Sequence, residues 1–273
     1  MKIPRSTQEM IPVKHILNDG TFVLDSGEYS KMFAFTDINY TELRDEEKMR
    51  RLVDYSALLN SIDKGIYAKI SIFFRPIRQE QFERDVLIPM NPEDELDDYR
   101  ENMNTVLREQ VRGTLGMTKQ AYLTITAGRR NDEDAAAFFA RVEGNLISSF
   151  QALGVELRAV PLSERLRLLH DIYRPGLEET FRYDAHAEKK LGMNWKDSIA
   201  PLSAEALNSC THLKIGGRYC KTLFLNAYPI YLNDRIVSDI ASIGKPMIFT
   251  IDFLPIPSAE AMAEAESRSM AID

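Results

Sequence analysis

The side chains best suited to chemistry form a run of carboxylates directly behind Asn91–Pro92: Glu93, Asp94, Glu95, Asp97 and Asp98. Carboxylate oxygens bind divalent cations, so the run could serve a metal-dependent enzyme such as a nuclease. Carboxylates also gather in the first turn of a helix, because they meet the positive end of the helix dipole. No second ligand cluster with a defined spacing follows the run. We therefore interpret the run as a helix start, and the stand-alone carboxylate and metal enzyme stays an alternative.

No complete catalytic set of residues occurs elsewhere in the sequence. Gly244–Lys245 is the only Gly-Lys pair, and Pro246 follows it, so the phosphate-binding pattern G-x-x-x-x-G-K-[ST] does not occur. His170–Asp171 has the residue types of an acid and base pair, but it falls on an amphipathic helix, where surface or structural roles are commoner. From these residues we expect no enzyme activity, no cofactor and no metal ion.

Two sets of side chains are suited to binding a partner. Arg129 and Arg130 occupy a predicted turn, where they could contact an acidic partner or serve a single-stranded DNA-binding module. Tyr228 and Tyr231 flank Pro229–Ile230, where they could anchor a partner or close a strand-to-helix corner. The net charge of −7 provides no general attraction for phosphates, so direct nucleic-acid binding is not expected.

The composition favours a cytoplasmic protein. Hydrophobic residues make up 44% of the chain and charged residues 27%, which is typical of a folded, water-exposed domain. No stretch approaches the ~18 apolar residues that cross a bilayer, and residues 1–10 lack the apolar centre of a signal peptide. Cys210 and Cys220 are interpreted as reduced thiols.

Hydrophobic periodicity predicts an α+β fold, in which mixed, mainly antiparallel sheets carry helices on their faces. Asn18–Asp19–Gly20 separates the strands 13–17 and 21–24, which predicts a hairpin. Further strands are expected at 29–36, 67–75, 121–127, 155–160, 212–215, 218–226 and 247–254. Helices with one apolar stripe are expected after Asp45, behind the acidic run, over 135–150, behind Ser163 as a cap and over 236–243. The stripe behind the acidic run consists of Leu96, Tyr99, Met103, Val106, Leu107 and Gln110.

A weak internal repeat suggests two related lobes that each contain a β-α-β unit. Residues 27–35 and 217–225 share a glycine, a tyrosine and a lysine at the same spacing before an apolar run. Each is followed by a helix and then by a strand that ends in Pro-Ile, at Pro76–Ile77 and Pro255–Ile256. We expect an N-terminal lobe at 1–176, an irregular excursion or junction at 177–210, a second lobe at 211–257 and a helix start at 258–273. This last helix has no C-cap glycine before the chain stops, which suggests a cut inside a longer protein.

Several short sequence segments, considered together and in chain order, resemble the N-terminal region of conjugative-transfer ATPases, the VirB-four or TraC/TraE-like class of type IV secretion. The resemblance covers nearly the whole chain and is closest to forms carried on integrative conjugative elements. No single segment is a catalytic signature, so the specificity of the resemblance comes from order and extent. The segments are Gly27-x-Tyr29-Ser30-Lys31, Phe35–Tyr40, Leu58–Ser61, Glu164–Leu166 with Leu169 and Asp171–Tyr173, Ile199–Pro201, Lys214–Gly216 with Tyr219, and Leu225 with Tyr228–Pro229 and Tyr231–Leu232.

This resemblance implies an assembly and docking role. In that family the N-terminal region holds the motor against inner-membrane channel subunits and supports its oligomerisation. ATP and Mg²⁺ belong to a downstream RecA-like domain with Walker motifs, which this sequence lacks. The resemblance therefore implies a non-catalytic region that is cytoplasmic and peripheral at the inner face of the membrane.

Overall fold

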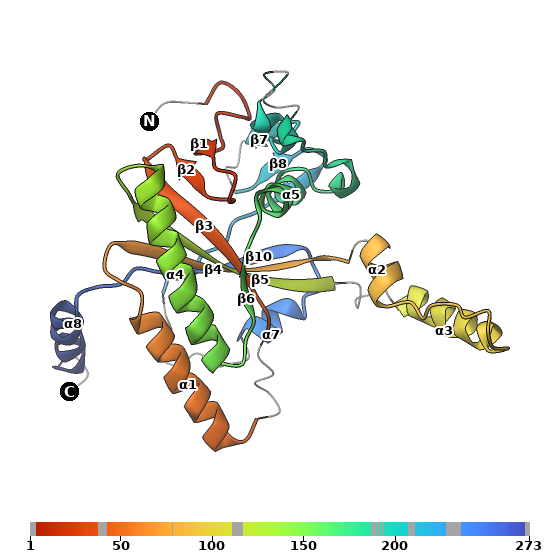
Figure 1. The fold of residues 1–273 in the computed structure, drawn as a ribbon, viewed down its shortest axis with the longest axis horizontal. Coiled ribbons are helices and arrows are strands. Elements are labelled where there is room, and N and C mark those ends of the chain that lie inside the picture. Colours follow the sequence, from red (N-terminus) through yellow and green to blue (C-terminus); the bar gives the residue numbers. More distant parts are fainter. Residues whose placement is uncertain are drawn as a thin grey trace. The chain divides into compact units, whose positions relative to one another are not determined.

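The computed structural model describes residues 4–37, 43–77, 79–110, 117–186, 190, 192, 194–206, 211–227 and 236–270. The fold is α+β, with mainly antiparallel sheets and packed helices, which confirms the predicted class (Figure 1). Among the described helices, none combines the length and the apolar character needed to cross a membrane.

The larger sheet has the strand order β1-β2-β3-β5-β4-β10, and β6 pairs with β3 outside this path. Its strands are β1 (Val13–Ile16), β2 (Phe22–Leu24), β3 (Glu28–Phe35), β4 (Ile66–Pro76), β5 (Met117–Gly128), β6 (Leu157–Ala159) and β10 (Met247–Phe253). The smaller sheet, β7-β8-β9, is antiparallel and consists of Ala204–Ala206, Leu213–Ile215 and Arg218–Cys220.

The predicted N-terminal hairpin is confirmed, because β1 and β2 pair antiparallel across the turn at Asn18–Asp19–Gly20. Gly20 has a φ of 84°, which favours glycine. Any side chain here would also meet a neighbouring segment, since a Cβ on Gly20 would lie 2.6 Å from the carbonyl oxygen of Val160. The Asp19 carboxylate accepts a hydrogen bond from the Thr21 backbone N–H at 3.0 Å and fixes the turn.

Several helices carry acidic residues in the first turn, where they meet the positive end of the helix dipole. The described α-helices are α1 (Asp45–Asn60), α2 (Gln79–Asp85), α3 (Asp97–Gln110), α4 (Asp132–Ala152), α5 (Leu162–Tyr173), α7 (Ile236–Ala241) and α8 (Ser258–Met270). At the start of α4, the Asn131 side chain accepts a hydrogen bond from the Asp134 backbone N–H. The prediction that Ser163 caps α5 is wrong, because the cap position is Pro161 and the helix already begins at Leu162. Pro161 has an extended backbone at this position and makes no side-chain cap hydrogen bond.

The chain divides into two compact units. Unit 1 comprises Met1–Ala68, Leu123–Asn226 and Asp252–Asp273, and unit 2 comprises Lys69–Tyr122 and Ala227–Ile251. These units are assembled from separated segments, whereas the predicted lobes are contiguous in sequence. β3 has eight residues and β9 has three, although both belong to the predicted repeat. The relation between two lobes stays a prediction.

One core cluster of unit 1 joins the hairpin, α5 and the segment predicted as an irregular junction. Its buried members are Ile11, Val13, Phe22, Leu166, Trp195, Ile199 and Ala200. Trp195 lies in the short 3-10 helix η3 (Trp195–Ser198), and its ring centroid is 6.2 Å from that of Phe22. The Lys196 ammonium donates to the Ile11 carbonyl oxygen at 2.9 Å. Part of the irregular segment therefore contributes to the core of unit 1.

Candidate partner-contact surfaces

The two predicted arginine contacts occupy different environments at the end of β5. The guanidinium carbon of Arg129 lies 3.5 Å from the centroid of the Phe138 ring on α4, and this side chain is half-buried. Such stacking is a favourable cation–π contact. The Arg130 side chain is exposed, while its backbone N–H donates to the Asp134 carboxylate at 3.1 Å. Arg129 therefore helps to pack α4, and Arg130 is the better placed of the two for a partner.

The other two predicted contacts, Tyr228 and Tyr231, lie outside the described residues. Their proposed role in anchoring a partner stays a prediction.

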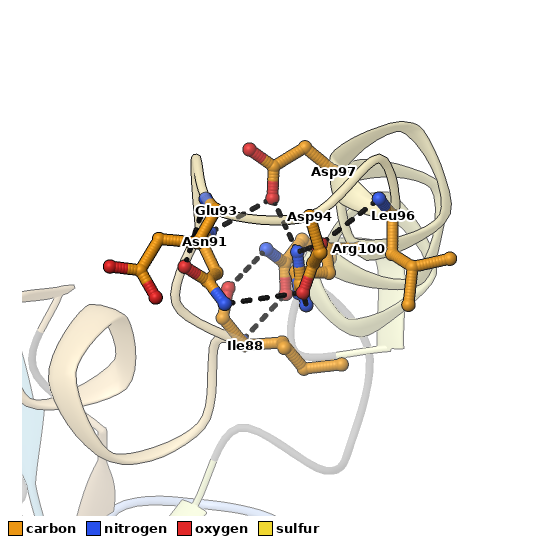
Figure 2. Close-up of polar contacts among 8 residues, drawn as sticks. Ile88, Asn91, Glu93, Asp94, Leu96, Asp97 and Arg100 are labelled. Atoms are coloured by element: carbon orange, nitrogen blue, oxygen red, sulfur yellow. Dashed lines mark hydrogen bonds and ion pairs between the residues drawn. The ribbon is translucent and has the colours of Figure 1, made fainter.

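Two carboxylates of the acidic run, Asp94 and Asp97, form hydrogen bonds with one arginine, Arg100 (Figure 2). Asp94 accepts two hydrogen bonds from the Arg100 guanidinium, each at 2.5 Å, and Asp97 accepts a third at 2.7 Å. Asp94 also accepts from the Leu96 backbone N–H at 3.0 Å, and Asp97 accepts from that of Asn91 at 2.9 Å. The hydrogen bonds from Arg100 and Leu96 lower the pKa of Asp94 to about 2.

These contacts give the acidic run a local structural role. Asp97 is the first residue of α3, as the interpretation of the run as a helix start predicts. A cation would have to displace Arg100 from Asp94 and Asp97 before it could use their oxygens. In the described part of the chain, no group of three or more His, Cys, Asp or Glu side chains is arranged to hold a metal ion.

The residue that α3 buries is polar, whereas the periodicity of the sequence predicted that its apolar stripe would be buried. Asn104 is only 2% exposed. Its side-chain oxygen accepts from the Ile88 backbone N–H at 2.8 Å, and its side-chain nitrogen donates to the Ile88 carbonyl oxygen at 2.9 Å. Both backbone groups of Ile88 are thus satisfied by one amide side chain, which ties the segment after α2 to α3. The signal in the sequence was an asparagine in mid-helix, a position where it has a low intrinsic preference.

The apolar stripe of α3 faces solvent instead. Tyr99 is 71% exposed and Met103 is 52% exposed, and Leu96 and Val106 are exposed as well. Figure 2 shows the Leu96 side chain pointing away from the Arg100 guanidinium. We name residues 88–110 the α3 arm; in Figure 1 its helix follows α2, and both lie between β4 and β5 in the chain. An exposed apolar surface of this kind is typical of an interaction site.

Helix α1 in unit 1 also carries exposed apolar side chains. Met49, Leu52 and Val53 are exposed, although their helical spacing suggested one packed face. Leu58 is the residue that α1 buries among those described. The Arg51 guanidinium donates to the Ala152 carbonyl oxygen at 3.2 Å and links α1 to the end of α4.

The His170–Asp171 pair lies inside unit 1. The His170 ring is fully buried, with Nδ1 3.6 Å from the Asp171 carboxylate and Nε2 3.3 Å from the Thr180 hydroxyl. The Phe181 ring stands edge-on to it at 5.3 Å between centroids. Burial lowers the pKa of His170, which favours the neutral form of the ring. These contacts hold the segment after α5 against that helix.

A second buried polar group, Arg165, joins α5 to the hairpin and to β3. Its guanidinium donates to the carbonyl oxygens of Gly20 and Ser30 at 2.9 and 2.6 Å, and to the Ser30 hydroxyl at 2.8 Å. It also lies 3.8 Å from the centroid of the Phe22 ring. Burial lowers the pKa of Arg165 to about 9, so the side chain keeps its charge at neutral pH.

Comparison of the chain with protein-family models and with curated proteins finds no match.

Proposed function

We propose that this chain is a non-catalytic assembly and docking module of a conjugation (type IV secretion) motor ATPase. It links the motor to inner-membrane channel subunits and to its own oligomer, and it works at the inner face of the cell membrane. The observation that carries the proposal is the exposure pattern of α3. The polar side chain of Asn104 is buried, whereas the large side chains of Tyr99 and Met103 are exposed to solvent.

The arrangement of α3 favours a binding role because its exposed stripe is held on an ordered helix. Arg100 bonds to Asp94 and Asp97 at the helix start, and Asn104 bonds to Ile88 one turn further on. A contact surface that is already ordered loses less conformational entropy on binding than a disordered one. The exposed apolar residues of α1 add a second surface for assembly in unit 1.

The proposal is tested by co-expressing the chain with the inner-membrane channel subunits of a conjugative element and purifying the complex through the channel subunit. We expect the chain to co-purify, and we expect the isolated chain to hydrolyse ATP no faster than a buffer control. Failure to co-purify with any of these subunits, or ATP turnover by the purified chain, would reject the docking role.

A further inference from the structure

We infer that the α3 arm docks its apolar stripe into an apolar groove whose rim is basic, on a protein partner that is not a second copy of this chain. The inference rests on the proposed function and names the chemistry of the partner that the same surface takes.

The anchors share one stripe of the helix. Tyr99, Met103 and Val106 stand at positions i, i+4 and i+7 of α3, and all three are exposed. Side chains at this spacing line up on one face, which is the pattern read by proteins that bind a helix in a groove. Tyr99 is an effective anchor because it adds a large contact area and a hydroxyl group with few rotatable bonds.

The acidic residues beside the apolar stripe favour a groove with basic residues along its rim. Residues 93–110 contain seven acidic residues and two arginines. Both arginines already pair within the arm, Arg100 with Asp94 and Asp97, and Arg108 with Glu101 at 2.7 Å. Exposed carboxylates remain on the helix flank and before it, at Glu93, Glu95, Asp98 and Glu109.

The same charge disfavours the other occupants of an apolar surface. Two copies of the arm would bring their carboxylates together, and like charges across an interface oppose association. An anionic bilayer surface would repel the arm for the same reason. A groove bordered by lysine and arginine would attract it, and this attraction would weaken as salt is added.

The test uses fluorescence anisotropy of the whole chain with a labelled amphipathic peptide of leucine and lysine, which presents an apolar face with a basic rim. The Tyr99→Ser/Met103→Ser variant removes two anchors from the α3 arm. The matched control, Leu52→Ser/Val53→Ser, removes two similarly exposed apolar side chains from α1. A peptide with glutamate in place of lysine controls for charge. Circular dichroism and thermal unfolding verify that both variants keep the fold.

We expect the wild-type chain to bind the lysine peptide and not the glutamate peptide, with an affinity that falls as salt is added. The α3 variant should bind at least about tenfold more weakly, as loss of central apolar anchors does in other interfaces, and the α1 control should bind like the wild type. Equal binding by the two variants, no binding at all, or equal binding of the two peptides would overturn the inference. Light scattering that shows a dimer dissociated by the α3 variant would assign the arm to a second copy, and arm-dependent binding to anionic vesicles would assign it to a membrane.

Failure of this inference and failure of the proposed function give different results. If the α3 variant still co-purifies with the inner-membrane subunits, the arm is not the contact and the docking role stands. If the wild-type chain fails to co-purify but binds the lysine peptide through the arm, the docking role at the channel is rejected. The inference that the arm binds an apolar surface with a basic rim is then upheld.

Discussion

Helices α4 and α3 start in the same way and use their apolar residues in opposite ways. Each has an acidic first turn. Helix α4 in unit 1 buries its stripe, with Phe139 only 1% exposed. Helix α3 in unit 2 buries Asn104 and exposes Tyr99. Apolar residues at helical spacing therefore show that one face favours contact, but they do not tell whether the same chain or a partner provides it.

The largest expected difference between the two helices is in stability. Phe139→Ala should lower the free energy of unfolding by about 3–5 kcal/mol, because it opens a cavity in a packed core. Met103→Ala should change it by no more than about 0.5 kcal/mol, because the side chain is already half in water. Urea denaturation of both variants measures the difference. Equal losses would show that the stripe of α3 is part of the core.

A second contrast concerns two glycines of unit 1. Gly20→Ala should destabilise the chain by about 1–3 kcal/mol, because its φ of 84° and the Val160 carbonyl oxygen at 2.6 Å both oppose a Cβ. Gly144→Ala in α4 is the matched control, since nothing lies within 4 Å of its Cβ position. It should stabilise the helix by about 0.5–1 kcal/mol. Thermal unfolding of the pair is the measurement, and a stabilising Gly20→Ala would contradict the packing of this turn.

Acid should lower the stability of unit 1 through protonation of His170. Because burial lowers the folded-state pKa of His170 below 6.5, the unfolded chain binds the proton more tightly. The stability from this group is therefore present above pH 6.5 and is lost as the pH falls below that value. His170→Gln should flatten this part of the pH profile of unfolding. An unchanged slope in the variant would assign the acid sensitivity to other groups.

The smallest effect is expected in the α3 arm, where the titrating group, Asp94, is half-buried beside Arg100. Asp94 has a folded-state pKa of about 2 against an ordinary value of 3.8. Its contribution to stability is therefore complete above pH 3.8 and is lost as the pH falls toward about 2. Arg100→Gln should move the pKa of Asp94 up toward 3.8, because the largest cause of the shift is the hydrogen bond from Arg100. Carbon-13 NMR of the carboxyl groups measures it. Glu95, outside this set of bonds, is the control.

The sequence predicts the regular elements well where a local cause dominates. The turn at Gly20 and the apolar residues on either side specify the hairpin, and the cap at Asn131 with the apolar period behind it specifies α4. The acidic run correctly marks the start of α3. These features depend on neighbours in the chain, so the sequence alone is sufficient.

Features that depend on distant contacts were not predictable in this way. Trp195 looked like part of an irregular junction, yet it packs on Phe22 across more than half of the chain. The burial of Asn104 depends on its two bonds to Ile88, which no periodicity reveals. Ser163 has the residue type of a helix cap, but the cap position is Pro161 and the helix already begins at Leu162. Among the predicted partner contacts, Arg129 is half-buried over Phe138, because a long side chain can fold back on its own unit.

A binding titration tests the docking role of the chain most directly. The purified chain is titrated against detergent-solubilised inner-membrane channel subunits of a conjugative element, immobilised for interferometry. We predict saturable association that weakens at least about tenfold in the Tyr99→Ser/Met103→Ser variant, as loss of central anchors requires. No association at any concentration of a correctly folded chain would contradict the account.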